Sequence, residues 1–213
     1  MNLYNTTHLD SERLEGLFHR FAGPYPLDGI DVLVRYTRSA AFSGSCCYQT
    51  RRLCIRIGRR NKYPYGIKTY VARPQSNRTH WWRPPYTVYV QDAYQLALFL
   101  FRHELYHWLV RLARRNTRQK EGRCDRFAVR ALVDGHAAVV YDPQGRPVAR
   151  EEWDFQDLDG FVARALRRRT APRLKMLPPP AVKPAARQRP KLDVAAPKSI
   201  GIPAEARQLW LFG

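Results

Sequence analysis

Five consecutive residues, His103-Glu104-Leu105-Tyr106-His107, carry two imidazoles and a carboxylate at a spacing that suits metal chemistry. Residues four apart on an α-helix are separated by about 400° of rotation, so His103 and His107 project from one face, one turn apart. This geometry suits two nitrogen ligands of one tetrahedral Zn²⁺ ion. Glu104 is rotated by about 100° from His103 and can act as a general base on a water molecule beside the metal. The run therefore predicts a hydrolytic zinc centre with Glu104 as its catalytic residue.

The helix that must carry this run is predicted over residues 92–115, which hold the strongest helical pattern in the chain. Its apolar stripe continues through both histidines, in the order Leu96, Phe99, Leu100, His103, His107 and Val110. We therefore expect the histidines to face the core, where two buried imidazoles need partners. A metal ion supplies one partner to each. The alternative is a chance run on an amphipathic helix, with both histidines packed and satisfied.

A second helix, predicted over residues 121–133, brings two carboxylates toward the same face. Helical spacing puts Glu121 and Asp125 in line with its apolar stripe, which consists of Cys124, Phe127, Ala128, Ala131 and Leu132. An inward carboxylate is costly unless it is paired or binds a metal. Glu121 is therefore predicted as the third ligand, with water in the fourth position. Asp125 is predicted to accept the far N–H of a ligand histidine. Cys124 and the more distant His136 are the alternative ligands.

This combination resembles the gluzincin metallopeptidases, in which HExxH is followed by ExxxD on the next helix. The matching residues are His103, Glu104, His107, Glu121 and Asp125, and the resemblance covers residues 88–132. Phe127-Ala128 is similar to the IrrE/ImmA-type branch, whereas SprT/Spartan-like peptidases more often use a third histidine. The resemblance implies a small zincin-like α+β domain, with a mixed or antiparallel sheet packed on a central HExxH helix. It also implies one Zn²⁺ ion and peptide hydrolysis.

The remaining patterns up to residue 169 complete one α+β domain. Further helices are predicted over 11–21 and 157–168, strands over 32–36, 53–57 and 87–90, and a hairpin over 139–148. The strand at 87–90 comes just before the metal helix, so we expect it to hold an extended substrate by strand addition. Tyr141 in the hairpin is the predicted oxyanion-stabilising residue, with a role in core packing as the alternative.

The charge balance points to a polyanionic partner. The chain has 37 Lys and Arg against 18 Asp and Glu, a formal net charge of +19. Nucleic acid is the usual partner of such an excess, and an anionic membrane surface is the rival. Two predicted loops interleave cations with aromatic residues, and the predicted DNA contacts are Arg59, Arg60, Lys62, Arg78, Trp81, Trp82 and Arg83. The alternative is a solvated basic surface, with Trp81 and Trp82 packed under the sheet.

The expected location is the cytoplasm, in association with the nucleoid. The chain contains no run of about 18 apolar residues, so we expect no membrane-spanning helix. Residues 1–10 lack the pattern of a secretory signal. The four cysteines include no CxxC pair and are predicted to be reduced thiols.

The C-terminal residues, 170–213, differ in composition from the rest. They contain 8 of the 16 prolines and have no hydrophobic period, so they predict a disordered basic tail. The tail ends in a dense apolar cluster that resembles the bacterial sliding-clamp-binding peptide, Gln-Leu-x-Leu-Phe. The matching residues, within 208–212, are Gln208, Leu209, Leu211 and Phe212. The alternative is that this cluster docks on the catalytic domain.

These patterns together predict a zinc-dependent endopeptidase that cuts DNA-associated proteins, including proteins crosslinked to DNA, and is recruited by the DNA polymerase sliding clamp. Spartan-like proteases share this plan of an HExxH domain, basic DNA contacts and a tail with a clamp-binding peptide. Glu121 as third ligand is the departure from that family. Two alternatives remain: an IrrE/ImmA-like regulatory protease that cleaves a repressor, and a non-catalytic DNA or clamp adaptor with a structural zinc.

Overall fold

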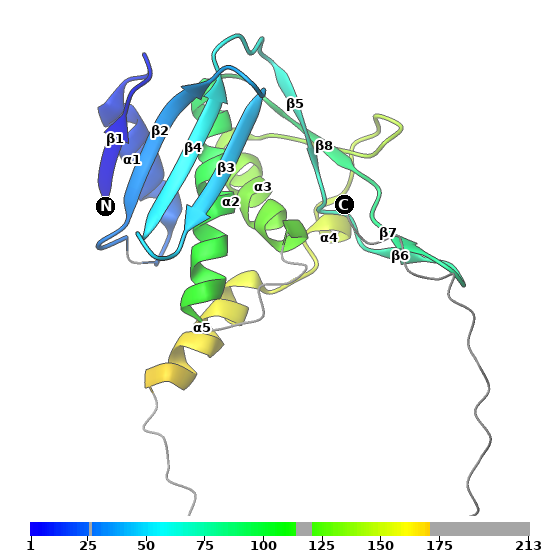
Figure 1. Cartoon of the computed structure of the whole chain (residues 1–213). Coiled ribbons are helices and arrows are strands. Elements are labelled where there is room, and N and C mark those ends of the chain that lie inside the picture. Colours follow the sequence, from blue (N-terminus) through cyan, green and yellow to red (C-terminus); the bar gives the residue numbers. More distant parts are fainter. Residues whose placement is uncertain (26, 114–120, 171–213) are drawn as a thin grey trace, which may run out of the picture. The chain divides into compact units, whose positions relative to one another are not determined.

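The computed structural model describes residues 1–25, 27–113 and 121–170 (Figure 1). The predicted α+β class is confirmed, and Met1–Pro172 form one compact unit. Residues 171–213, and with them the predicted clamp-binding peptide, lie outside the described residues. The strands are β1 (Asn2–Asn5), β2 (Asp31–Thr37), β3 (Phe42–Cys47), β4 (Arg52–Gly58), β5 (Tyr65–Thr69), β6 (Gln75–Ser76), β7 (Trp81–Trp82), β8 (Tyr86–Val90) and β9 (Val140–Tyr141). The helices are α1 (Ser11–Ala22), α2 (Ala93–Leu112), α3 (Glu121–His136), α4 (Arg150–Trp153) and α5 (Leu158–Thr170).

The first sheet has the strand order β1-β2-β4-β3, in which the first three strands run parallel and β3 runs antiparallel to β4. Alternate residues of β2 and β4 are buried because they pack on the helices, and α1 and α2 lie on this face (Figure 1). Ile55 on β4 is one of these buried residues and is paired with Gly44 on β3. Gly44 therefore belongs to the same face, and β3 forms the edge of the sheet beside α2.

The second sheet has the order β5-β8-β9, and its pairing corrects one prediction. Strand β8 pairs with β5 over its whole length and with β9 at Thr87 and Val88. One edge of β8 is therefore used over its whole length and the other at Thr87 and Val88. None of residues 87–90 lines the cavity that contains His103, so the prediction that they hold the substrate is wrong. The hairpin predicted over 139–148 is confirmed, because Tyr141 bridges to Pro147 across a turn.

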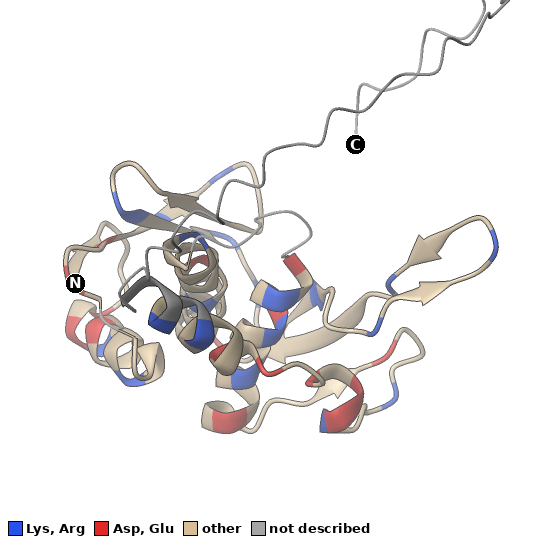
Figure 2. Ribbon diagram, turned by 90° about the horizontal axis from the view of Figure 1, so that it is seen from below, with Lys and Arg blue, Asp and Glu red and all other residues tan. Residues whose placement is uncertain are grey.

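A small hairpin of β6 and β7 extends from the second sheet and is the third sheet of the fold. It was predicted as a basic loop, and its two short strands were missed. Figure 2 shows this hairpin projecting from the body of the domain, and residues 75–82 contain one cation, Arg78, and no Asp or Glu. Trp81 and Trp82 are 61% and 44% exposed, so they do not pack under the sheet. Both rings remain accessible to a ligand.

Helix α2 runs through the centre of the domain. It begins after Asp92, whose side chain accepts a hydrogen bond from the Gln95 backbone N–H at 2.8 Å. Most of its residues are buried because the first sheet, α1 and α3 all pack around it. The long apolar pattern predicted a helix of this kind, buried on most sides. Neither α2 nor any other described helix is both long and apolar enough to cross a membrane.

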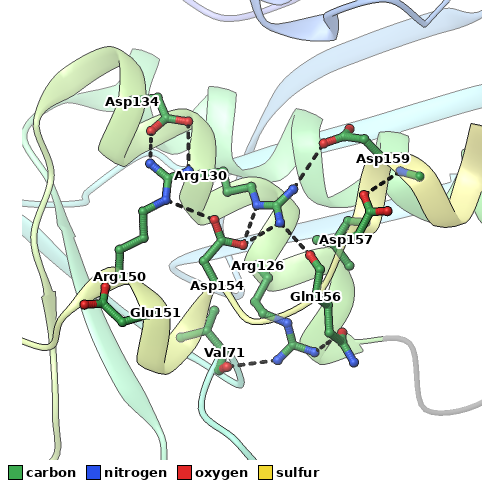
Figure 3. A network of polar contacts seen from close by, with 12 residues as sticks. Val71, Arg126, Arg130, Asp134, Arg150, Glu151, Asp154, Gln156, Asp157 and Asp159 are labelled. Carbon is green, nitrogen blue, oxygen red and sulfur yellow. Dashed lines mark hydrogen bonds and ion pairs between the residues drawn. The ribbon is translucent and has the colours of Figure 1, made fainter.

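Two arginines on α3 form hydrogen bonds that hold two other segments of the chain against α3 (Figure 3). Arg126 is buried and donates to the Val71 carbonyl oxygen at 2.9 Å and to Gln156 Oε1 at 2.7 Å. Arg130 donates to Asp154 Oδ1 and to the Gln156 carbonyl oxygen, both at 2.6 Å. The segment that follows β5 and the segment between α4 and α5 are therefore both held on α3.

This network gives a prediction about stability. Arg130→Ala should lower the free energy of unfolding by about 2 kcal/mol, because it removes the charge-assisted bond to Asp154 Oδ1, on a carboxylate that is 8% exposed, together with the bond to the Gln156 carbonyl oxygen. Asp154 then keeps its bond from Arg150, and the Gln156 carbonyl keeps its bond from the Leu158 backbone N–H. Arg146→Ala is the control, because it removes an exposed i,i+4 pair with Asp142 and should cost less than about 1 kcal/mol. Denaturant titration measures both values. Equal losses in the two variants would show that the network does not stabilise the fold.

Candidate metal centre

Three potential ligand atoms converge where α2 meets the N-terminus of α3. His103 Nε2 lies 3.0 Å from His107 Nε2 and 3.2 Å from Glu121 Oε2. His107 Nε2 lies 3.4 Å from the same carboxylate oxygen. The two imidazoles are mostly buried, whereas the Glu121 side chain is 60% exposed. The structure therefore brings together the three residues that the sequence predicts as ligands.

The size of this triangle matches the edge of a coordination tetrahedron. Bonds of about 2.0–2.1 Å to a tetrahedral centre put neighbouring ligand atoms about 3.3 Å apart. The three measured distances, 3.0, 3.2 and 3.4 Å, lie around that value. Two nitrogens and one carboxylate oxygen at these separations can hold a divalent metal ion. The exposure of Glu121 leaves an open side from which water or a substrate can approach.

A buried carboxylate sets the orientation of the first histidine. Asp125 Oδ1 lies 2.9 Å from His103 Nδ1, and Asp125 Oδ2 accepts a hydrogen bond from the Tyr70 backbone N–H at 2.7 Å. When Nδ1–H donates to Asp125, the lone pair of His103 is on Nε2 and points toward His107 and Glu121. Asp125 thus supports the site in the role that the sequence predicts.

The electrostatics of the centre favour a positive charge. Burial disfavours the charged form of His103, but hydrogen bonds with Asp125 and Glu121 outweigh it and raise the pKa of His103 to about 10. Hydrogen bonds with His103 and His107 hold the pKa of Glu121 well below its usual range. Both shifts arise because carboxylates face imidazoles in a site partly screened from water. A metal cation can interact with the same carboxylates that otherwise stabilise a proton on His103.

Glu104 lines the same cavity, and its carboxylate lies against β3. It is 5% exposed, and the space for its carboxylate is provided by Gly44. A Cβ atom on residue 44 would lie 2.2 Å from Glu104 Oε1 and 2.9 Å from its Cγ and Cδ. Any larger residue would therefore force Glu104 to move. The sequence carries no local signal for this role of Gly44, since it depends on the pairing of β3 beside α2.

A cavity of about 540 Å³ joins these groups. Its floor is formed by α2 and the start of α3, one wall by β3, and the opposite wall by β5 and Tyr70. Outside the metal cluster, the side chains in its lining that can donate a hydrogen bond through a hydroxyl or ammonium group are Ser45, Tyr48, Lys68 and Tyr70.

Cys124 offers a further ligand atom. Its sulfur and the ligand nitrogens of His103 and His107 all lie within 4.8 Å of one another, and these three residues could hold a metal ion. Cys124 is fully buried one turn along α3 from Glu121. The two carboxylate contacts at 3.2 and 3.4 Å are closer, so Glu121 fits the third position better. Cys124 lies near enough to join the site as an additional ligand.

Two other sequence-based predictions are wrong. His136 lies at the far end of α3 and stacks on Phe21, with ring centroids 5.7 Å apart, so it does not reach the metal centre. Tyr141 packs edge-on against Tyr89 at 5.7 Å and lines a different cavity. It cannot stabilise an oxyanion beside His103. The error for Tyr141 arises because the position of the second sheet relative to α2 cannot be read from local patterns, whereas His136 lies about four helical turns from Glu121 along α3.

The predicted nucleic-acid contacts occupy two separate parts of the surface. Arg59, Arg60 and Lys62 are exposed in the loop between β4 and β5, where both arginines line a cavity that also includes Arg38. The other four residues belong to the β6–β7 hairpin and its base, and they are Arg78, Trp81, Trp82 and Arg83. Within the described ranges, no carboxylate lies within ion-pair distance of the cations at positions 59, 60, 62, 78 and 83. These cations are available to an anionic partner.

Comparison with protein-family models, curated proteins and solved structures gives no match to this chain. The function proposed below therefore depends on the geometry of the residues themselves.

The bridging role of Asp125 leads to a prediction about metal affinity. Asp125→Asn should weaken the binding of a divalent transition metal by roughly 10-fold to 100-fold, because the orientation of His103 is no longer fixed. Asp134→Asn, on the exposed part of the same helix, is the matched control and should bind as tightly as the unchanged protein. Competition with a chromogenic chelator measures both. Unchanged affinity in Asp125→Asn would contradict a metal site at His103.

Proposed function

We propose that this chain is a zinc-dependent endopeptidase that acts on DNA-associated proteins. The observation that carries the proposal is the triangle of His103, His107 and Glu121 donor atoms, with Glu104 in the same cavity. Two imidazole nitrogens and one carboxylate oxygen, with an open fourth position, form a donor set typical of catalytic zinc. A mixed nitrogen and oxygen set of this kind suits zinc better than magnesium or calcium.

Zinc, when bound, would supply a Lewis acid that acidifies water and polarises a peptide carbonyl. The chain's own residues supply the proton transfers. Glu104 takes a proton from the attacking water and passes it to the nitrogen of the leaving amine. Its burial beneath Gly44 keeps the carboxylate in a fixed position on the β3 side of the cavity. Asp125 holds the His103 ring throughout, because it also bonds to the Tyr70 backbone.

Strand β3 is the element best suited to hold the peptide. It is the edge strand of the first sheet, and Phe42, Gly44, Ser45 and Cys46 line the cavity. A peptide added to this edge would form backbone hydrogen bonds without regard to its sequence. Its carbonyl groups would then pass beside Glu104 and the metal ligands. This role, which the sequence assigned to residues 87–90, is now proposed for β3.

The DNA-associated setting is supported by charge. The net charge of +19 exceeds what a peptidase requires, and the exposed cations of the β4–β5 loop and the β6–β7 hairpin lack carboxylate partners within the described part of the chain. Such surfaces bind phosphates and release counterions, so the affinity for DNA should fall steeply with salt. The setting is that of a peptidase held near the nucleoid.

The chemical step can be tested with Glu104→Gln. This variant should keep its zinc but cleave a DNA-crosslinked protein roughly 10²-fold to 10⁴-fold more slowly, because it lacks the general base. His107→Ala should lose both zinc and activity. Elemental analysis and gel-resolved cleavage with added zinc measure the two properties. Cleavage by Glu104→Gln as fast as by the unchanged protein, or zinc content unaffected by His107→Ala, would refute the proposal.

Recruitment by the clamp is tested separately, because residues 208–212 lie outside the described structure. Deletion of residues 207–213 should abolish binding to a bacterial sliding clamp, and Leu211→Ala should weaken it strongly. Trp210→Ala is the matched control, because the middle position of the clamp-binding pattern is not fixed. Calorimetric titration with the purified clamp measures these affinities. Equal binding by Leu211→Ala and Trp210→Ala would contradict the motif.

A second function, a non-catalytic adaptor with a structural zinc, is favoured by the position of Cys124. If Cys124 joins His103, His107 and Glu121, the metal has four protein ligands and no open position. Cobalt(II) substitution distinguishes the two sites, because a cobalt–thiolate bond gives a charge-transfer absorption that is lost in Cys124→Ser. The peptidase proposal expects no such band and full activity in Cys124→Ser.

A further inference from the structure

A second hollow adjoins the metal centre on the side away from β3. It has a volume of about 360 Å³ and is lined by Tyr70, Trp81, Trp82, Arg83, Glu121 and Gly122. Tyr70 and Glu121 also line the cavity that contains the metal ligands. The two hollows are therefore neighbours that share Tyr70 and Glu121 as a common boundary. We refer to the second one as the Trp81/Trp82 groove.

Three aromatic rings give the groove an apolar character. Tyr70, Trp81 and Trp82 are 55%, 61% and 44% exposed, which is unusual for rings of this size gathered in one place. No described part of the chain covers them. The close approach of the hairpin base to α3 depends on Gly122, because a Cβ there would lie 2.7 Å from the Tyr70 carbonyl oxygen and 2.1 Å from Arg83 Nη1. The shape of the groove therefore depends on the close packing of the hairpin base against α3.

We infer that the Trp81/Trp82 groove binds one large apolar side chain of the peptide substrate, next to the bond that is cut. The inference rests on the proposed peptidase function and adds a sequence preference to it. A peptide held along β3 crosses the metal centre, and the residue beyond it reaches Glu121 and the mouth of the groove. The volume suits a Leu, Phe or Trp side chain, and contact with aromatic ring faces stabilises such a group.

The composition of the groove favours a peptide side chain over a nucleobase. Glu121 is one of two charged residues in the lining, and its carboxylate faces the entrance from the metal centre. A nucleotide placed there would bring its phosphate close to this carboxylate, whereas an apolar side chain carries no charge. The exposed cation Arg78 lies in the turn of the hairpin, between β6 and β7, and is not part of the lining. Arg83, the other charged residue of the lining, lies against Gly122 beside Glu121, whereas Arg78 in the turn has no carboxylate in the same hollow. Phosphate contacts are therefore expected at the turn.

The test measures peptide binding without turnover. Zinc-loaded, full-length Glu104→Gln is applied to an array of peptides that differ at one position, and the best binders are titrated in solution. Peptides with Leu, Phe or Trp at that position should bind roughly tenfold or more tightly than those with Ser or Asp. The additional change Trp82→Ala should remove most of this preference, and Trp82→Phe should retain part of it. Cleavage of the same peptides by otherwise unchanged protein should show the same order.

The control is Tyr4→Ala, which removes a ring of similar exposure from β1 and should leave the preference unchanged. An unchanged preference in Trp82→Ala would overturn the inference. So would a loss of oligothymidylate binding in Trp82→Ala with the peptide preference intact, which would assign the groove to nucleobases. If apolar peptides bind as expected but zinc-loaded wild type does not cut them, the groove stands as a peptide site and the peptidase proposal fails.

Discussion

The carboxylate of Asp125 connects the three segments on which the site depends. One oxygen bonds to the His103 ring on α2, the other to the backbone at Tyr70, and the residue itself belongs to α3. Because it is nearly buried, each of these bonds forms with little competition from water. Their combined effect is to direct His103 Nε2 toward His107 and to fix the chain that leads from β5 to the hairpin. The metal ligands and the groove beside them are therefore positioned by the same side chain.

The spacing of residues along α3 determines which of its side chains can reach a metal ion at His103 and His107. Glu121, Cys124 and Asp125 follow one another at intervals of three and one, so all three lie on the face turned to α2. The outermost, Glu121, reaches both imidazoles and stays accessible, whereas Cys124 is fully buried beneath it. A hard carboxylate at the surface and a soft thiolate below are two different third ligands. With one of them as third ligand the centre keeps an open position, whereas binding by both would give the metal four protein ligands and close it.

Local patterns predicted the helices and the convergence of the candidate metal ligands because both follow from helical periodicity. The stripe through His103 and His107, and the continuation of the α3 stripe back to Glu121, required only the rotation of about 100° per residue. The roles of Gly44 and Tyr70 could not be predicted in this way, because each depends on a strand pairing beside a distant helix. The assignments of Tyr141 and residues 87–90 failed for the same reason: alternation identifies a strand but not its neighbours.

The helices and the sheets therefore contribute different parts of the site. The chemistry of the centre comes from two adjacent helices, whose residues are close in sequence and constrained by helical geometry. The hollows beside the centre are lined by β3 on one side and by the β6–β7 hairpin on the other, segments that reach the site through sheet pairing. The exposed rings of Trp81 and Trp82 lie on the hairpin, whereas His103 and His107 lie on α2, so the two sets of residues belong to separate elements. In the peptidase proposed above, this separation would let the exposed aromatic residues change while the reaction stays the same.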